Sequence, residues 1–217
     1  MTDRDPAETH RIGEARLASF TAGIPAEVRA EAERLPRQLE LMNASPAAKI
    51  RRVHAMTDRI FSTAGPLVAC ARGCAHCCYV SVPISRAEAA YIGERIGVAP
   101  VDIQTSLHRD EKSFSYATPC TFLRNDECTI YEHRPMTCRS HFSFDRDNYW
   151  CRHENWEKPG AAIPKPNFTI LRDAYMAASA RKGERPVFAD IRDFFPAPQN
   201  PGEREGGRSG HRERERS

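Results

Sequence analysis

Apolar residues recur at helical spacing through residues 1–65, with charged residues between them. Two stripes carry this pattern: Val28, Leu35, Leu39 and Met42 in the first, and Ile50, Val53, Ile60 and Phe61 in the second. Pro46 suits the first turn of the second helix, behind Ser45 as its N-cap. The sequence therefore predicts an N-terminal helical region over 1–65 whose stripes are packing surfaces.

The elements become shorter after this region. Residues 79–84 alternate apolar and polar side chains as an extended segment, and the proline within it favours an edge strand or a turn. Ser85 and Glu88 have the spacing of a capping box, and the helix behind them is predicted to end near Gly97. A second short helix is predicted after Pro100. Its apolar positions are Val101, Ile103 and Leu107.

Two short apolar pieces flank the polar turn from Arg124 to Glu127. They predict a β-hairpin whose strands carry Cys120 and Cys128. Pro135 interrupts any following helix, so we expect Cys138 to return toward the same place.

The C-terminal part alternates between helix and polar segments. Prolines between 159 and 166 predict a linker-like crossing, and apolar spacing predicts a helix over 168–181. The chain thus divides into an N-terminal helical region (1–65), a cysteine-cluster metal-binding domain (66–158), a helical region packing on it (159–195) and a tail (196–217). The tail is dominated by Pro, Gly, Glu, Arg and Ser, so we expect it to be disordered.

The predicted fold class is α+β and predominantly α-helical, with a small cysteine-rich, metal-centred domain, a short hairpin and flanking helices. Leu, Ile, Val and Phe make up only 38 of 217 residues, which is little core for this length. Because the net charge is only +3, this low share does not indicate a disordered chain. We expect a metal to replace part of the missing core.

Charge and hydropathy exclude two classes of partner. The 32 basic and 29 acidic residues interleave along most of the chain, whereas nucleic-acid-binding proteins usually gather positive charge on one face. No apolar run of about 18 residues is present, so no membrane span is expected. No signal peptide is visible either, and a cytoplasmic location follows as an expectation. In that reducing compartment, cysteines are expected to be metal ligands or small buried side chains rather than disulfides.

Seven of the eight cysteines lie in the segment from Cys70 to Cys138. Four of them occupy nine positions, in the pattern Cys70-x3-Cys74-x2-Cys77-Cys78. Such short gaps let several thiolates converge on one metal without closing long loops. The cysteine pattern therefore predicts a metal site.

With the second cysteine group included, the pattern resembles the YkgJ-like CxxCxxCC cysteine-cluster family, whose members are described as zinc- or iron-chelating. The residues that carry the resemblance are Cys70, Cys74, Cys77, Cys78, Pro119, Cys120, Phe122, Leu123, Cys128, Ile130, Tyr131, Glu132, Arg134, Pro135, Cys138 and Arg139. The resemblance covers about a third of the chain and implies a bound metal. Some similar proteins, the flagellin lysine N-methylases, join such a pattern to methyl transfer, but no glycine-rich nucleotide loop is visible here.

The expected ligands are ranked by their place in the pattern. The core set is Cys74, Cys77, Cys120, Cys128 and Cys138, with Cys70 and Cys78 close behind. Cys151 is either a ligand or a small buried side chain beside Trp150. Histidines close to the cysteines could each replace a thiolate, although most histidines in such positions are solvated or hydrogen-bonded. His141 leads them because it follows Cys138 by three residues. The others are His76, His133 and His153.

Three further residues are expected to support a cofactor. Arg134 and Arg139 are expected to hydrogen-bond thiolates or sulfides and to offset their negative charge, with surface ion pairing as the alternative. Tyr131 is expected to pack beside them, with its hydroxyl group bonded.

Spacing leaves the metal open. Zinc takes four ligands in a closed tetrahedron, so seven or eight thiols suit one cluster with spare thiols, or two sites. Successive side chains point in different directions, so one of Cys77 and Cys78 is expected to bind while the other packs or serves a second centre. An iron–sulfur cluster or iron is therefore one candidate cofactor, and zinc is the alternative.

Two functions agree with this sequence. The first is a metal-binding protein that acts as a redox component or modifies a protein or peptide. The second is a non-catalytic module in which structural zinc holds a small fold for partner binding or metal chelation. Since no Ser-His-Asp set, P-loop or dinucleotide fingerprint is visible, the sequence assigns no reaction.

Overall fold

In a computed structural model, the chain is described over residues 4–108, 118–155, 158, 164–181 and 184–197. The expected tail lies almost wholly outside these residues, as does most of the expected linker. The helices are α1 Pro6–Gly23, α2 Ala26–Leu41, α3 Pro46–Phe61, α4 Arg86–Ile96, α5 Met136–Ser140, α6 Thr169–Ser179 and α7 Ile191–Phe194. Short 3-10 turns are η1 Gly65–Leu67, η2 His76–Tyr79, η4 Tyr131–His133, η5 Tyr149–Cys151 and η6 His153–Asn155.

Two small antiparallel sheets complete the fold. Strand β1 (Pro83–Ser85) pairs with β4 (Phe188–Asp190), and Ile84 lies opposite Ala189. Strand β2 (Leu123–Arg124) pairs with β3 (Glu127–Cys128). The predicted α+β, predominantly helical class is confirmed.

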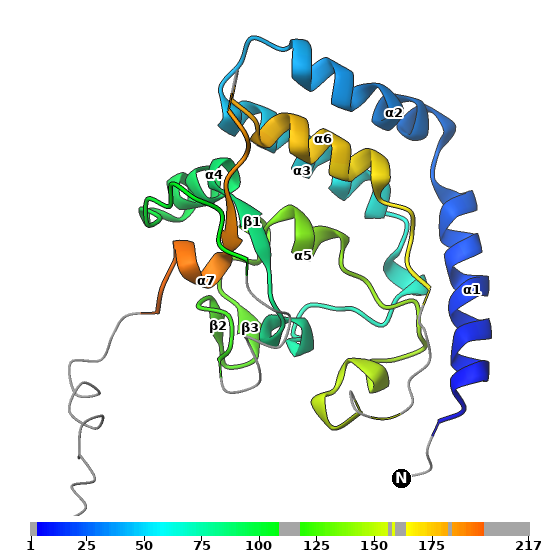
Figure 1. The fold of residues 1–217 in the computed structure, drawn as a ribbon. Helices are drawn as coiled ribbons and strands as arrows, with labels where there is room; N and C mark the ends of the chain where they lie inside the picture. Colours follow the sequence, from blue (N-terminus) through cyan, green and yellow to red (C-terminus); the bar gives the residue numbers. More distant parts are fainter. Residues whose placement is uncertain (1–3, 109–117, 156–157, 159–163, 182–183, 198–217) are drawn as a thin grey trace, which may run out of the picture.

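Three of the long helices form a layer on one side of the molecule. In Figure 1, α6 runs alongside α2 and packs on α3, while α1 lies along one edge of the molecule. The buried faces meet in a core that contains most of the predicted stripe positions of α2 and α3: Val28, Leu35, Leu39, Ile50, Val53 and Phe61. Ile60 is partly buried against this core, whereas Met42 follows α2 as its C-cap and does not belong to it. The Ser45 hydroxyl accepts a hydrogen bond from the Ala48 amide at 3.2 Å, and Pro46 opens α3, so that predicted start is confirmed.

A second core lies under β1, α4, β4 and α7. Its buried residues include Ile84, Ile92, Ile191 and Phe194, and several thiols pack against them. The cysteine region is thus continuous with this core. Its thiols pack where a chain with more apolar residues would place aliphatic side chains.

The segment after Pro100 differs from the prediction. No helix forms over residues 101–108, which instead run beside the C-terminal elements. The Val101 amide donates to Phe194 O and the Leu107 amide donates to Phe188 O, each at 2.8 Å. These long-range bonds satisfy the backbone groups that a local helix would have used, so tertiary pairing overrides the apolar spacing.

The start of α4 is also only partly as predicted. Ser85 is the N-cap, and its hydroxyl accepts from the Glu88 amide at 3.1 Å. The Glu88 side chain does not return to the Ser85 amide, because that amide donates to Tyr175 Oη at 2.8 Å. The helix ends at Ile96, and Gly97 follows in the left-handed conformation, as predicted.

Among the described residues, no helix combines the length and the apolar character that crossing a membrane requires.

Candidate metal centre

Seven of the eight thiols line one cavity of about 110 Å³: Cys70, Cys74, Cys77, Cys78, Cys120, Cys128 and Cys138. Cys151 lines a neighbouring cavity of about 210 Å³, together with Cys70, Cys74 and Cys77. No disulfide joins any of the eight cysteines, all of which lie in the described residues. The structure therefore brings every predicted cysteine ligand to one region of the molecule.

The first cysteine group lies on a tight turn that leads into η2. Gly73 has a φ of +87°, which only glycine adopts at low cost, and the Cys74 amide donates to Ala71 O at 3.0 Å. The Cys78 amide then donates to Ala75 O at 2.8 Å. This backbone course makes several thiols face the same cavity wall.

The hairpin carries Cys128 toward this turn. Asn125 and Asp126 have φ values of 49° and 60°, as a two-residue type I′ turn requires. Cys128 lies opposite Leu123 in the pair. Cys120 lies just before β2 rather than within it, which corrects the predicted strand, and its amide donates to Cys78 O at 2.7 Å. The hairpin and the first cysteine group are therefore joined directly.

A buried ion pair that the sequence did not reveal supports the same junction. The Arg192 guanidinium donates to Cys78 O at 2.9 Å, and to Val80 O and Pro119 O at 3.2 Å. It also pairs with Asp190 at 3.0 Å. Arg192 is only 7% exposed, so these bonds are shielded from water. The C-terminal element thereby fixes the backbone on both sides of the Cys78–Cys120 contact.

Cys138 reaches the cavity from α5, whose first amide is bonded to a buried side chain. Met136 N donates to Glu88 Oε1 at 2.7 Å, and Glu88 is 0% exposed. His54 Nε2 lies 2.5 Å from the same oxygen, and Tyr175 Oη donates to Glu88 Oε2 at 2.5 Å. Glu88 therefore connects α3, α4 and α6 to the helix that carries Cys138.

Five of the thiols that line the cavity have raised pKa values, which favours their protonated form when no metal is bound. Burial raises the pKa values of Cys70, Cys120 and Cys128, and raises that of Cys138 well above its usual range. A hydrogen bond with Cys78, followed by burial, raises the pKa of Cys77. Reactive catalytic cysteines have lowered pKa values. These thiols are therefore poor nucleophiles on their own, and a bound cation would have to displace their protons.

Arg134 places a positive charge beside several of these thiols. The positive charge of Arg134 acts to lower the pKa values of Cys70, Cys77 and Cys128, although burial outweighs it. Its guanidinium lies 4.0 Å from the centroid of the Tyr131 ring, and both residues line the cavity. The Arg134 Nε atom is buried without a hydrogen-bond partner. A buried donor next to several thiols fits an anionic, thiolate-rich occupant.

Arg139 has a different position from Arg134. Its guanidinium is bonded to the Asp58 carboxylate at 2.6 and 2.8 Å, and to the carbonyls of Arg134 and Glu132. Arg139 thus fixes the 132–134 backbone against α3 and does not line the cysteine cavities formed by the described residues.

The predicted histidines also separate by position. His141 lines both cysteine cavities and His76 lines the larger one. His133 and His153 are not among the described lining residues of either cavity.

The donor set fits a thiophilic metal, but its members are not yet gathered around one point. Within the described ranges, no three His, Cys, Asp or Glu side chains are already arranged to hold a metal ion. A cysteine side chain rotates about a single χ1 bond. Thiols that line the same cavity would therefore approach a common metal by side-chain rotation. The residue types, their common cavity and the unpartnered Arg134 donor are the features that fit the metal.

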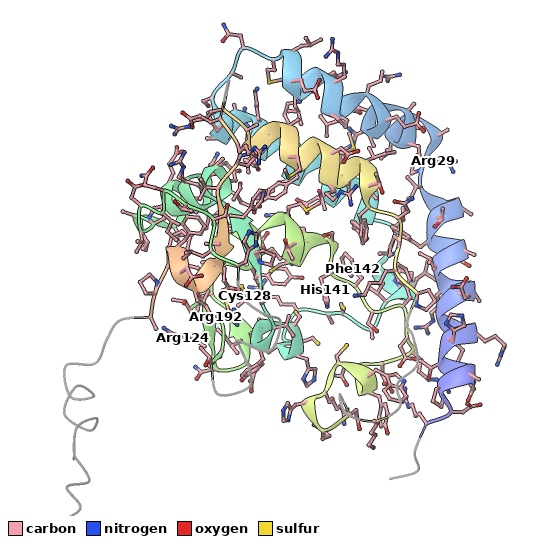
Figure 2. All side chains as sticks on the ribbon, in the orientation of Figure 1. Arg29, Arg124, Cys128, His141, Phe142 and Arg192 are labelled. Atoms are coloured by element: carbon pink, nitrogen blue, oxygen red, sulfur yellow. The ribbon has the colours of Figure 1, made fainter. Side chains whose placement is uncertain are left out.

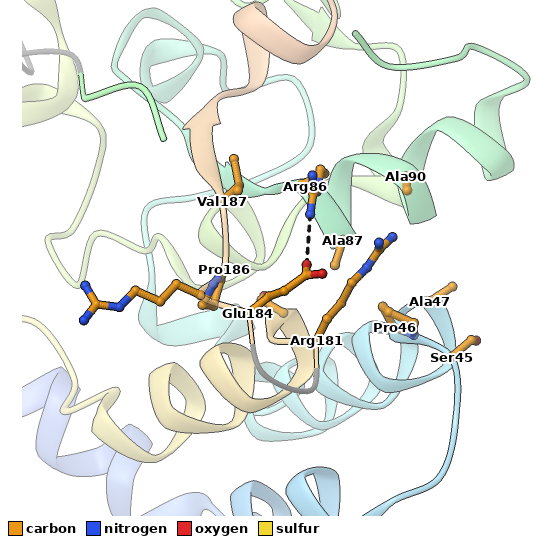
Figure 3. Close-up of a pocket in the computed structure, with 12 residues that line it drawn as sticks. Ser45, Pro46, Ala47, Arg86, Ala87, Ala90, Arg181, Glu184, Pro186 and Val187 are labelled. Atoms are coloured by element: carbon orange, nitrogen blue, oxygen red, sulfur yellow. Dashed lines mark hydrogen bonds and ion pairs between the residues drawn. The ribbon is translucent and has the colours of Figure 1, made fainter. Parts of the chain in front are cut away.

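Another cavity of about 200 Å³ lies away from the cysteines, between the starts of α3 and α4 and the segment after α6 (Figure 3). Arg86 and Arg181 contribute to its lining. Arg86 is bonded to Gln104 at 2.9 Å and faces Glu184 at 3.5 Å. Neither cysteine nor histidine contributes to this cavity among the described residues, so it does not extend the metal centre.

Comparison with protein families gives a match that coincides with this region. Residues 69–155 match the CxxCxxCC family model, described as a "Putative zinc- or iron-chelating domain". The resemblance predicted from the cysteine spacing is therefore confirmed for this segment. Neither the curated proteins nor the solved structures contain a significant match to the chain.

Proposed function

We propose that the CxxCxxCC segment of this chain, residues 69–155, chelates zinc or iron through thiolates of the cysteine cavity. The observation that carries the proposal is the convergence of seven free thiols on one cavity that also contains the unpartnered Nε atom of Arg134. The family description supports the same class of metal.

Each ligand-bearing segment would have a defined support. The Arg192–Asp190 pair holds the backbone at Cys78 and Pro119. Glu88 holds the first turn of α5, which carries Cys138. Arg134, placed over the Tyr131 ring, would donate from Nε to a thiolate or a sulfide. A bound metal would cross-link the Cys70–Cys78 turn, the hairpin and α5, and thereby stabilise a part of the chain that has few apolar residues.

Chelation explains the thiols better than covalent catalysis does. A nucleophilic cysteine needs a lowered pKa. Every thiol for which a shift is seen here has a raised pKa instead. Burial is the main cause at all of them except Cys77, where the hydrogen bond with Cys78 is the larger cause. An iron–sulfur cluster would suit the same thiols, and Arg134 would then face a bridging sulfide. No residue set at the cavity assigns a redox reaction or a modified substrate, so metal binding is the proposed function.

The test is metal analysis of protein purified without oxygen and without an affinity tag. Zinc, iron and acid-labile sulfide are measured per chain for the wild type, for Cys128→Ser/Cys138→Ser, and for Glu127→Gln as a control beside Cys128. We expect at least one metal per chain in the wild type and the control, and a loss in the double cysteine variant. Iron with matching sulfide would indicate a cluster, and zinc alone a chelating site. A wild type that takes up neither metal, even after anaerobic loading, would refute the proposal.

A further inference from the structure

The two cysteine cavities lie side by side and share part of their walls. Cys70, Cys74, Cys77 and His141 line both. Only the smaller cavity is lined by Cys78, Cys120, Cys128 and Cys138, and only the larger one by His76, Trp150, Cys151 and Lys165. Figure 2 shows Cys128 and Arg192 toward the hairpin, and His141 and Phe142 on the side that faces α1. The donors therefore spread over more space than one tetrahedral ion occupies.

Ser143 organises the part of the larger cavity that contains Cys70 and Cys151. Its amide donates to Cys70 Sγ at 3.4 Å, and its hydroxyl is hydrogen-bonded to the Cys151 thiol. The Ala69 amide donates to Ser143 O at 2.8 Å, which holds the two chain segments together. Hydrogen bonds to sulfur from a shared neighbour are typical of the surroundings of metal-bound thiolates, because they orient the ligand and stabilise its charge.

The thiols also fall into groups by the cavities that they line. Cys151 shares the larger cavity with Cys70, Cys74 and Cys77, and Cys138 shares the smaller one with Cys120 and Cys128. Cys77, like Cys70 and Cys74, lines both cavities.

We propose that Cys70, Cys74 and Cys151, with the imidazole of His141, form a second metal site for a borderline divalent cation of the Zn²⁺ class, beside an inner site formed by Cys77, Cys120, Cys128 and Cys138. This inference rests on the proposed chelating function and adds the number of sites and their ligands. Three thiolates and one imidazole are a known closed ligand set for Zn²⁺.

His141 is preferred over His76 because of their partners. His76 Nε2 lies 3.2 Å from Asn148 Nδ2, so this ring nitrogen is already engaged. His141 is exposed and lines the cavity from its rim. Lys165 lines the same cavity, and its positive charge would balance the single negative charge that three thiolates leave on a divalent cation. The second site is therefore open to solvent on the His141 side, and we expect it to exchange metal faster than the inner one.

The experiment counts bound Zn²⁺ by native mass spectrometry during anaerobic titration of the full chain with Zn²⁺. Four proteins are compared: the wild type, the outer-site variant Cys151→Ser/His141→Gln, the inner-site variant Cys128→Ser/Cys138→Ser, and the control His133→Gln. Zinc X-ray absorption spectra give the ratio of sulfur to nitrogen ligands for each loaded protein.

We expect two Zn²⁺ ions in the wild type and the control, and one in each double variant. The nitrogen contribution should disappear from the outer-site variant and remain in the inner-site variant, which a purely structural role of His141 would not produce. A wild type that binds one Zn²⁺, with its nitrogen content unchanged in the outer-site variant, would overturn the second site while leaving chelation intact. A wild type that binds no metal would instead overturn the proposed function itself.

Discussion

Glu88 offers a direct test of how the core supports the cysteine centre. Its side chain is 0% exposed and accepts from Met136 N at 2.7 Å and from Tyr175 Oη at 2.5 Å, while His54 Nε2 lies 2.5 Å away. Replacing Glu88 by Ala removes the shared acceptor of all three groups and leaves them in a dry environment.

The magnitude follows from the number of groups that lose a partner. A buried donor left without an acceptor costs ~1–3 kcal/mol. Three groups lose their acceptor, so the summed cost is ~3–9 kcal/mol before the surroundings relax. We therefore expect Glu88→Ala to lower the free energy of unfolding by ~3–5 kcal/mol, and Glu88→Gln by ~1–3 kcal/mol, because the amide keeps one acceptor oxygen but presents a donor where a second was.

The assay is urea unfolding of the metal-free protein, so that metal binding does not mask the effect. Glu94→Gln is the matched control, because Glu94 lies on the same helix and is exposed. Thermal midpoints should fall by ~2–4 °C per kcal/mol for a chain of this length. If Glu88→Ala and Glu94→Gln unfolded within ~0.5 kcal/mol of each other, the stabilising role of the Glu88 contacts would be refuted.

Three further outcomes follow from the site. Arg192→Lys should lower the free energy of unfolding in urea by ~2 kcal/mol or more. One ammonium group cannot replace the guanidinium bonds to Cys78, Val80, Pro119 and Asp190. The control Arg172→Lys should change the free energy of unfolding little, because Arg172 is exposed. Arg134→Gln should weaken metal binding ~10–100-fold in a competition assay with a chelator. The control is Arg72→Gln, because Arg72 also lies over the Tyr131 ring. Equal metal affinities of the two variants would refute a role of Arg134 in metal binding. Burial raises the pKa of Cys151 from 9.0 to about 11, and raises the pKa values of other thiols, so the folded state favours the protonated form. The contribution of the protonated thiols to stability is complete below pH 9 and is lost as the pH rises toward 11. The thermal midpoint of the metal-free protein should therefore fall between pH 9 and 11. A metal-loaded protein, whose ligands are already thiolates, should not show this fall.

The sequence predicted the parts of the fold that follow local rules. Most positions of the α2 and α3 stripes, the Ser45 cap and the end of α4 at Gly97 depend on residues within a few positions of each other, and the structure confirms them. Met42 is the exception, because it follows α2 and lies outside the core. The hairpin turn at Asn125 and Asp126 is equally local. The segment after Pro100 failed because its amides bond to β4 and α7, which come much later in the chain.

The candidate site shows the same division between ligands and supports. Cysteine spacing predicted the thiols as candidate ligands, because several cysteines crowded into a short segment are typical of metal ligation. Arg192, Asp190 and Glu88 were missed, because single charged residues in a chain rich in charge are indistinguishable from surface residues. The capping-box spacing with Ser85 already explained a glutamate at position 88 by a local role. Only its burial between three helices shows that its side chain bonds to other elements.

These supports also bear on how far the cysteine region is independent. Its predicted boundaries are 66–158, yet Asp58 and His54 come from α3, Tyr175 from α6, and Arg192 from α7. Each of them contacts the backbone or the helix that carries a candidate ligand, or the side chain that fixes it. A metal bound by the thiols would therefore stabilise contacts well outside the matched family segment, and loss of those contacts would in turn loosen the thiols. Metal binding and the contacts from the flanking helices depend on each other, because both stabilise the same arrangement of the Cys70–Cys78 turn, the hairpin and α5. The helical regions on either side therefore support the candidate metal centre, although none of its candidate ligands lies in them.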